Sequence, residues 1–302
     1  MYFTRRVFQI LISGLAVLVG LSFMQPSVAE TSRYEVGPIG EPLGELNMQV
    51  WRVPVDLEDG GGTITLEATV FRPDGDGPFP LAIFTHGAEP NAPTDGPYDF
   101  RPDTAIRWFM SKGYAVAALV RRGYGRSEGQ RSVLDGLGWP ELLTPHRERA
   151  NDINSAAKYF RDQPFVEGNR MVMVGLSAGG NGVLAAASEN PKGVQGVIAF
   201  VPGGGAINRN ELEDRDLTER AFRAFGATNK LPVLWVYPEN DQFYSPKLAR
   251  IFFEAYAAET SAEQELVILP LEGEDGHDIL LRDDGPQIWG AAVDEFLDRV
   301  MP

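Results

Sequence analysis

A serine stands between two closely spaced glycines in the run Gly175-Leu176-Ser177-Ala178-Gly179. The residues just before it, 171–174, are apolar and predict a short buried strand, while residues from 183 onward predict a helix. On a sharp turn between a strand and a helix, a serine hydroxyl projects from the sheet and can act as a nucleophile. A side chain on either glycine would crowd that turn. The motif also occurs by chance, so this interpretation requires partners elsewhere in the chain.

A serine hydroxyl is a weak nucleophile unless a neighbouring base accepts its proton. The chain offers three histidines for that role, His86, His146 and His277. It contains no cysteine, which excludes thiol catalysis, disulfides and cysteine-ligated metal sites. The choice of an imidazole base is therefore confined to three positions.

Polar residues follow two of the later predicted strands. Asp241 comes after the predicted strand at 231–237, and His277 comes after the predicted strand at 265–269. In an open parallel sheet, ligand chemistry gathers beyond the carboxyl ends of the strands. Together with Ser177, these residues give the order Ser–Asp–His that is expected of an α/β-hydrolase triad.

We therefore predict Ser177 as the nucleophile and His277 as the general base, then acid. Asp241 is predicted to orient the His277 ring and to stabilise its cation. Two alternatives stay open, because Glu239 could take the place of Asp241 and His277 could cap the following helix. Asp275 and Asp278 flank His277 too closely to orient it and are interpreted as solvated loop charges.

Backbone N–H groups could stabilise the oxyanion that forms when the serine attacks. The first donor would be Ala178, at the start of the helix after the nucleophile. His86-Gly87 ends an apolar strand and resembles the dipeptide whose following N–H completes an oxyanion hole, so the second donor would be Ala88, or alternatively Gly87. His86 itself is expected to brace this loop rather than to do chemistry.

Two further residues receive weaker interpretations. Tyr124 lies in the glycine-rich loop 122–129, where it could form a wall of the site or donate a hydrogen bond to the substrate. Alternatively, that loop is only a turn held by salt bridges of Arg126. His146 follows Pro145 and precedes a charged helix, and it is interpreted as a loop residue.

Alternating strands and helices must position these residues. Strands are predicted at 48–55, 62–71, 81–85, 114–120, 171–174, 194–201, 231–237 and 265–269. Helices are predicted at 104–112, 147–161, 183–188, 247–258 and 286–300. The first two strands suggest an antiparallel hairpin after an irregular lead-in at 30–47. The later, continuously apolar strands predict an α/β fold, with a mostly parallel sheet covered by helices on both faces.

By these motifs the chain resembles the α/β-hydrolase superfamily, and within it the dienelactone-hydrolase-like and prolyl-oligopeptidase-like serine esterase branch. The resemblance spans residues 48–300 and is carried by Thr85-His86-Gly87, the loop 122–129, the Ser177 turn, Glu239-Asn240-Asp241 and Gly276-His277-Asp278. Dienelactone hydrolases proper use a cysteine nucleophile, which this chain lacks, so cyclic dienelactones are poor candidate substrates. The resemblance implies a serine hydrolase that needs no cofactor and no metal.

Composition limits the partners. The 302 residues carry a formal net charge of −15, which argues against nucleic acid, because binding to phosphates needs clustered Lys and Arg. The two histidines outside the proposed triad show no metal-ligand spacing. A small-molecule ester is the expected partner, and the sequence predicts no particular oligomeric state.

Residues 1–29 have the pattern of a signal peptide. Arg5 and Arg6 precede an uncharged apolar run at 7–24, and Ser27-Val28-Ala29 offers the small residues of a cleavage site. The protein is therefore expected to be exported to the periplasm or secreted and to have no membrane contact after cleavage. The paired arginines leave both the twin-arginine route and the ordinary export route open. An uncleaved anchor is the alternative, because the apolar run approaches membrane-spanning length.

The remaining residues, 30–302, are predicted to form a single α/β-hydrolase domain with a short lid-like insertion around 202–230. The predicted function is hydrolysis of carboxylic esters through an acyl-enzyme. Peptidase, amidase or acyltransferase activity on the same triad is the first alternative. A catalytically silent binding protein is the second.

Overall fold

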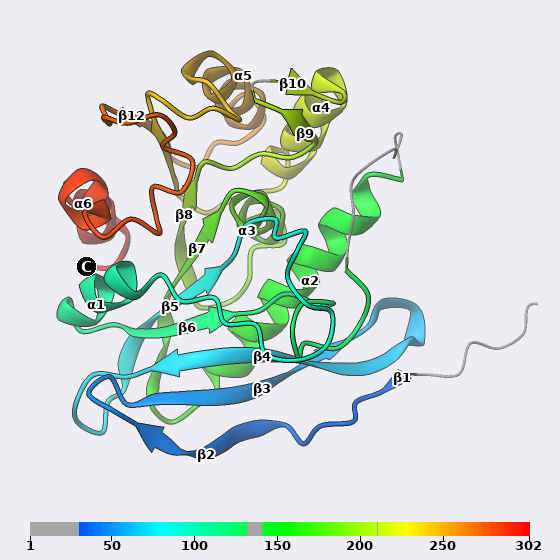
Figure 1. Ribbon diagram of the computed structural model, residues 1–302, viewed down its shortest axis with the longest axis vertical. Helices are drawn as coiled ribbons and strands as arrows, with labels where there is room; N and C mark the ends of the chain where they lie inside the picture. The colour runs from blue at the N-terminus through cyan, green and yellow to red at the C-terminus, as the bar shows by residue number, and fades with distance from the viewer. Residues whose placement is uncertain (1–29, 132–140, 210) are drawn as a thin grey trace, which may run out of the picture.

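A ten-stranded mixed sheet forms the centre of the computed structural model, which describes residues 30–131, 141–209 and 211–302. The strand order is β12-β11-β8-β7-β5-β6-β4-β3-β2, with β1 paired to β4 (Figure 1). The strands are β1 Glu30–Thr31, β2 Gly37–Leu43, β3 Met48–Asp56, β4 Gly62–Phe71, β5 Phe79–Thr85, β6 Ala115–Leu119, β7 Val166–Leu176, β8 Val194–Phe200, β11 Val233–Pro238 and β12 Gln264–Leu269. A separate small sheet pairs β9 Ala206–Asn208 with β10 Glu211–Leu212.

The helices alternate with the parallel strands. They are α1 Asp103–Ser111, α2 Leu143–Arg161, α3 Ala178–Ala187, α4 Arg215–Gly226, α5 Pro246–Ala257 and α6 Gly285–Val300, with a short 3-10 turn η1 at Glu58–Gly60. The six strands from β12 to β6 pair in parallel along the sheet. This arrangement confirms the predicted α/β fold with a mostly parallel sheet.

The N-terminal part of the sheet is antiparallel. β3 pairs with β4 around η1, and β4 joins the parallel strands through β6, so the predicted hairpin is confirmed. The prediction of an irregular lead-in at 30–47 was wrong, because β2 pairs with β3 there. Two prolines, Pro38 and Pro42, lie in this strand; it runs along the outer edge of the sheet, the position where a strand tolerates proline.

Helices cover both faces of the sheet. On one face, the Trp235 ring of β11 packs 5.6 Å from Phe222 of α4 and 5.4 Å from Tyr256 of α5. On the opposite face, Phe200 of β8 packs 5.5 Å from Trp289 of α6. α1 lies beside α6, where the Trp108 and Trp289 rings are 5.0 Å apart (Figure 1). Both faces of the interior parallel strands are therefore buried, as their continuous apolar sequences require.

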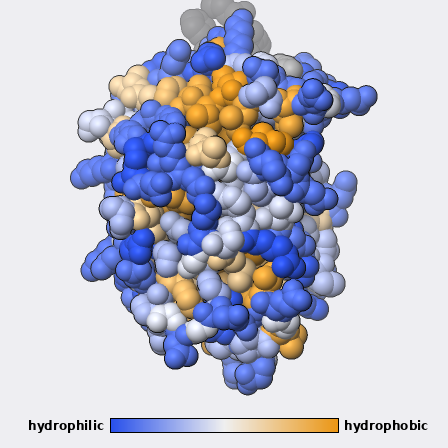
Figure 2. All heavy atoms as spheres, turned by 90° about the vertical axis from the view of Figure 1, so that its left-hand side faces the viewer, coloured by the Kyte–Doolittle hydropathy of each residue, from blue (hydrophilic) through white to orange (hydrophobic). Residues whose placement is uncertain are grey.

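The edge strand β12 is less well covered than the strands inside the sheet. All six of its residues are half-buried, whereas all six residues of its neighbour β11 are buried. Figure 2 shows apolar side chains gathered toward the upper end of the face that it presents, the end at which β12 lies in Figure 1. β12, the strand that precedes the His277 loop, therefore pairs with a neighbouring strand on one side only.

The segment predicted as lid-like, 202–230, contains β9, β10 and α4. α4 begins with an N-cap, because Asp214 accepts a 2.9 Å hydrogen bond from the Leu217 N–H. Its buried face includes Phe222, whose ring lies 5.0 Å from Phe252 of α5. The helix therefore belongs to the layer on the sheet, and cover over the site by this segment stays a prediction.

The predicted signal peptide, residues 1–29, lies outside the described residues. In the rest of the chain that the structure describes, no helix combines the length and the hydropathy needed to cross a membrane. The first strand, β1, pairs in parallel with β4 from Glu30 onward.

The interpretation of His146 as a loop residue was wrong. α2 begins at Leu143, four residues before its predicted start, because Pro145 in the first turn needs no hydrogen-bonded N–H. His146 is only 2% exposed, and its ring lies 5.1 Å from Phe225 of α4. Burial, together with nearby Arg149, lowers the pKa of His146 from 6.5 to about 3.

Replacing His146 with leucine is expected to reduce the acid sensitivity of folding. In the unfolded chain this ring binds a proton below pH 6.5, whereas in the folded chain it stays neutral down to about pH 3. The stability of the fold therefore decreases as the pH is lowered from 6.5 to 3. At pH 5 the buried, neutral His146 lowers the free energy of unfolding by about 2 kcal/mol. Urea unfolding at pH 7 and pH 5 checks the prediction. An equal loss of stability in the wild type and in His146→Leu would contradict it.

Candidate active site

Ser177 occupies a strained turn between β7 and α3, with φ 54° and ψ −116°. The glycines of the motif have steric reasons to be there. A β-carbon on Gly175 would lie 2.3 Å from the Gly179 carbonyl oxygen, and one on Gly179 would lie 2.5 Å from the carbonyl oxygens of Thr85 and His86. The turn thus packs without side chains against the end of β5, which brings the His86 loop beside the serine.

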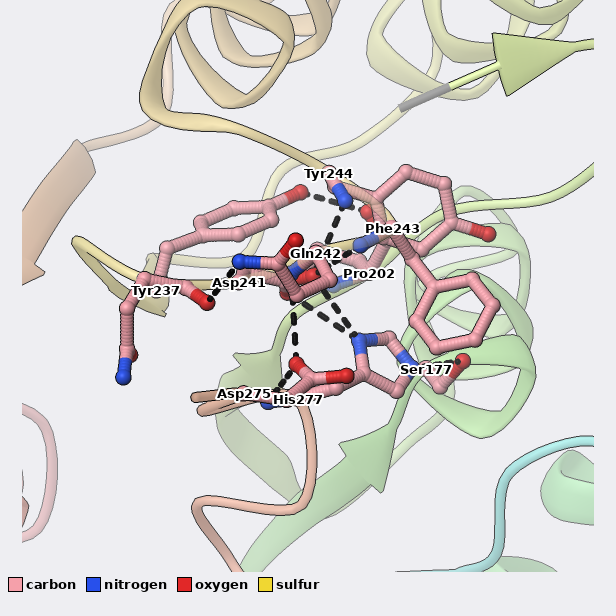
Figure 3. Close-up of polar contacts among 10 residues, drawn as sticks. Ser177, Pro202, Tyr237, Asp241, Gln242, Phe243, Tyr244, Asp275 and His277 are labelled. Carbon is pink, nitrogen blue, oxygen red and sulfur yellow. Dashed lines mark hydrogen bonds and ion pairs between the residues drawn. The ribbon is translucent and has the colours of Figure 1, made fainter. Parts of the chain in front are cut away.

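The structure brings Ser177, His277 and Asp241 together (Figure 3). The Ser177 Oγ lies 3.0 Å from His277 Nε2, and His277 Nδ1 lies 3.0 Å and 3.2 Å from the two carboxylate oxygens of Asp241. The Asp241 side chain is fully buried and that of His277 is 15% exposed. This is a hydrogen-bonded chain from a buried carboxylate to a hydroxyl, which is the arrangement that proton transfer from a serine needs.

The Asp241 carboxylate is held by its own loop. Its Oδ1 accepts hydrogen bonds from the N–H groups of Phe243 and Tyr244, at 2.7 Å and 2.9 Å. These bonds fix the orientation of the carboxylate beside the imidazole. Glu239, the competing carboxylate, is exposed and accepts no bond from His277. The geometry therefore favours Asp241 as the partner of His277.

Asp275 is a residue whose position the sequence did not reveal. Its Oδ1 accepts hydrogen bonds from the N–H of Gln242, at 3.2 Å, and from the N–H of His277, at 3.0 Å. The side chain therefore joins the Asp241 loop to the His277 loop, and its interpretation as a solvated charge was wrong. An aspartate two residues before a backbone N–H is typical of an Asx turn, which is the signal that could have indicated this role.

Aromatic rings limit the movement of the imidazole. The rings of Phe243 and Tyr244 lie 4.7 Å and 5.7 Å from the His277 ring (Figure 3). Burial and nearby Asp241 raise the pKa of Tyr244 well above its usual value, so its hydroxyl stays protonated. Tyr244 packs over Gly203, where any β-carbon would overlap its ring. The base is thus bordered by apolar surface on the side of the Asp241 loop.

The predicted oxyanion donors lie next to the nucleophile. Ala178 is the first residue of α3, where the N–H has no partner within the helix. A β-carbon on Gly87 would lie 3.4 Å from Ser177 Cβ and 3.9 Å from Ser177 Oγ, so this loop borders the reacting atom. Within the described part of the chain, the Ala88 N–H donates no hydrogen bond. The role of these two N–H groups as oxyanion donors stays a prediction.

His86 braces the loop that contains Gly87 and Ala88, as the sequence predicts. It is 1% exposed, its Nε2 accepts a 3.1 Å hydrogen bond from the Arg121 N–H, and its Nδ1 lies 2.9 Å from the Gly87 carbonyl oxygen. Burial and the Arg121 charge lower the pKa of His86 well below its usual value. The ring is therefore neutral, with its proton on Nδ1.

Tyr124 lies behind the same loop rather than at the surface. It is 4% exposed, and its ring lies 4.6 Å from the His86 ring and 3.9 Å from the Arg131 guanidinium. Arg131 in turn donates hydrogen bonds to carbonyl oxygens of loop 89–92, including one of 2.8 Å to Ala92. Tyr124 therefore supports the loop that follows β5, and a direct contact with substrate stays a prediction.

The glycine-rich loop 122–129 is held by an ion pair with α2. Arg122 Nη2 and Nε lie 2.7 Å and 2.8 Å from Asp152 Oδ1, and the Arg122 N–H donates to Asp152 Oδ2 at 3.1 Å. Asp152 is completely buried. Arg126, the residue considered for salt bridges, is exposed and forms none with the described residues. The anchor is therefore Arg122 rather than Arg126.

Replacing Asp152 with asparagine is expected to lower the free energy of unfolding by about 3–5 kcal/mol, because it removes the fully buried counter-ion of Arg122. Glu148→Gln is the matched control. Glu148 lies 3.9 Å from the same guanidinium but is 38% exposed, so its loss should cost less than about 1 kcal/mol. Urea unfolding measures both. Equal effects of the two variants would show that burial of the Arg122–Asp152 pair is not what stabilises the loop.

Metal binding finds no ready site in the described ranges, which contain no group of three or more His, Asp or Glu side chains placed to hold an ion.

Comparison with known proteins places the chain in a family. Its sequence matches the model of the X-Pro dipeptidyl-peptidase (S15 family) over residues 59–209, which is half of the chain and includes the Ser177 turn. The chain belongs to the X-Pro dipeptidyl-peptidase (S15) family. This membership confirms the resemblance to the serine esterase and peptidase branch of the α/β hydrolases, and it makes the S15 chain a serine hydrolase. Asp241 and His277 lie beyond the matched range.

The chain is similar to a curated protein in sequence and to an esterase and a peptidase in fold. The quorum-quenching protein AidA of Acinetobacter baumannii is 27% identical over 160 residues, which are 53% of this chain and 47% of AidA. The match thus spans about half the length of that relative. Acetyl xylan esterase 1 from Thermoanaerobacterium shares the fold, with TM-score 0.57, 16% identity and coverage of 89% and 88% of the two chains. Pyrococcus horikoshii acylaminoacyl peptidase gives TM-score 0.59, 18% identity and coverage of 86% and 42%.

Proposed function

We propose that this S15-family serine hydrolase is an exported enzyme that cleaves carboxylic esters through an acyl-enzyme intermediate. The observation that carries the proposal is the hydrogen-bonded chain from Asp241 through His277 to Ser177, with 3.0 Å at each of its two steps. A serine hydroxyl becomes a competent nucleophile when such a base accepts its proton.

In the proposed reaction, Ser177 Oγ attacks the carbonyl carbon of the ester while its proton passes to His277 Nε2. The carbonyl oxygen becomes an oxyanion, which the N–H groups of Ala178 and Ala88 would stabilise, with Gly87 as the alternative second donor. His277 then protonates the leaving alkoxide, which departs as the alcohol. Water, deprotonated by the same imidazole, releases the acid from Ser177, and Asp241 stabilises the imidazolium formed in each half of the reaction.

The likeness in fold to an esterase supports an ester substrate. The acetyl xylan esterase is covered over 88% of its own length, so this fold accounts for nearly the whole of that enzyme. We therefore place ester hydrolysis first.

Cleavage of X-Pro peptides is the second candidate, because the family match carries that description. The same triad can serve both reactions, because in each of them His277 protonates the leaving group. For an amide the leaving atom is a nitrogen, which is more basic than the leaving oxygen of a p-nitrophenyl ester. Substrate choice would then depend on the groups around the site rather than on the three residues themselves.

Paired kinetic assays distinguish the two candidates. The purified protein is treated with a fluorophosphonate probe, and the labelled peptide is identified by mass spectrometry. The kcat/KM of the unlabelled protein is measured on p-nitrophenyl acetate and butyrate and on Ala-Pro-p-nitroanilide. Labelling of Ser177 with a higher kcat/KM on esters supports the proposal. A higher value on the anilide would favour the peptidase, and absence of both labelling and turnover would exclude a serine hydrolase.

Export is the second part of the proposal and rests on residues 1–29, with two arginines, an uncharged apolar run and small residues up to Ala29. Cleavage there would leave Glu30, which already pairs with Gly62 in the sheet, as the first residue. Expression of the full chain followed by N-terminal sequencing tests this. A mature protein that begins at Glu30 outside the cytoplasm is expected. An intact N-terminus in the cytoplasmic or membrane fraction would contradict export with cleavage.

A further inference from the structure

The peptide group between Gly87 and Ala88 is held from one side only. The Gly87 carbonyl oxygen accepts a 2.6 Å hydrogen bond from Arg121 Nη2 and a second, 2.9 Å, bond from His86 Nδ1. A trans peptide is planar, and its N–H points opposite to its C=O. Two donors that fix the carbonyl direction therefore fix the direction of the Ala88 N–H as well.

This peptide lies next to the nucleophile. Gly87 lies close enough to Ser177 that a β-carbon there would be 3.4 Å from Ser177 Cβ. Within the described residues the Ala88 N–H donates to no protein acceptor. An N–H held in one direction without a partner is ready to bind charge that develops in a reaction, without reorganisation at that moment.

Arg121 acts on this loop through two of its groups. Its backbone N–H donates to His86 Nε2 at 3.1 Å, which leaves the imidazole proton on Nδ1, facing Gly87. Its guanidinium binds the same carbonyl directly. The side chain is 3% exposed and its guanidinium lies 5.1 Å from the Tyr124 ring, so it is packed in one place. A cation on the carbonyl oxygen also polarises the amide and strengthens its N–H as a donor.

We propose that Arg121 is a positioning residue for the oxyanion hole, holding and polarising the Gly87–Ala88 peptide so that the Ala88 N–H stabilises the transition state. The proposal rests on the ester hydrolysis proposed above. Arg121 touches neither substrate nor Ser177. Its effect should therefore appear in transition-state binding and not in the binding of the ester itself.

The test compares Arg121→Met and Arg121→Lys with Arg126→Met, a control in the same loop whose side chain is exposed. For p-nitrophenyl acetate, Arg121→Met should lower kcat about 10- to 100-fold, part of the roughly 10²–10³-fold cost of losing an oxyanion donor, and change KM less than about threefold. Affinity for a trifluoromethyl ketone, whose adduct carries the oxyanion, should fall by the same factor as kcat. Arg121→Lys should recover part of both losses, and Arg126→Met should change neither.

Saturating fluorophosphonate counts the intact sites, so a smaller active fraction is separated from a lower kcat. Folded Arg121 variants that keep wild-type kcat and inhibitor affinity would overturn the proposal. If neither variant folds, the wild-type protein decides, because its Ala88 amide proton should shift downfield in NMR when a boronic acid binds Ser177. An unshifted Ala88 resonance would overturn the proposal. Wild-type protein that neither turns over esters nor reacts with fluorophosphonate would instead overturn the proposed function.

Discussion

Replacing Ser177 with alanine is expected to lower kcat/KM for ester hydrolysis by about 10⁵–10⁶-fold, because the variant cannot form an acyl-enzyme. Among the described residues, the Ser177 hydroxyl donates a hydrogen bond only to His277. Alanine tolerates the positive φ of this turn as well as serine does. The fold should therefore persist, with unchanged circular dichroism. Activity on p-nitrophenyl acetate and loss of fluorophosphonate labelling measure the effect.

Ser188→Ala provides the matched control. Ser188 caps the other end of α3, and its hydroxyl donates to the Ala185 carbonyl oxygen at 2.6 Å, away from the site. Its replacement should leave kcat/KM within about twofold of the wild-type value, as surface changes usually have small effects. A Ser177→Ala protein that retains a tenth of wild-type activity would show that Ser177 is not the nucleophile.

Replacing Asp241 with asparagine is expected to reduce kcat by about 10³–10⁴-fold. The asparagine oxygen can still accept the N–H groups of Phe243 and Tyr244, so the loop keeps its shape. Its NH₂ group, however, would face His277 Nδ1, which cannot then donate to it. The imidazole would place its proton on Nε2 and lose the lone pair that accepts the Ser177 proton.

Glu239→Gln is the control for this prediction, because Glu239 is the nearby carboxylate that the sequence leaves as an alternative. It is exposed, and its neutralisation should change kcat less than about threefold. Steady-state kinetics on both variants decide between the two acids. A large loss in Glu239→Gln with a small one in Asp241→Asn would assign the orienting role to Glu239.

Much of this fold can be predicted because its signals are local. Continuous apolar runs such as 194–201 and 231–237 predict buried parallel strands, and β8 and β11 lie within one or two residues of those ranges. The triad candidates follow from the same topology, since the carboxyl ends of parallel strands share one edge. The order of the three residues along the chain was therefore enough to predict a triad of Ser177, Asp241 and His277.

The errors concern features that depend on tertiary contacts. β2 contains prolines and glycines, and only its pairing with β3 makes it a strand. His146 is buried by α4, a helix almost seventy residues later in the chain. Asp275 and Arg121 bind backbone groups of other loops, and no short-range pattern reveals which carbonyl or N–H a side chain will reach.

The chemistry of the site is divided between the middle and the rim of the sheet. Ser177 follows β7, an interior strand paired on both sides, whereas His277 follows β12, which is paired on one side only. A brief fraying of β12 from β11 would carry the base away from the nucleophile while most of the core stayed intact. Catalytic activity should therefore respond strongly to the pairing of β12 with β11. An inactive enzyme can still have a folded core.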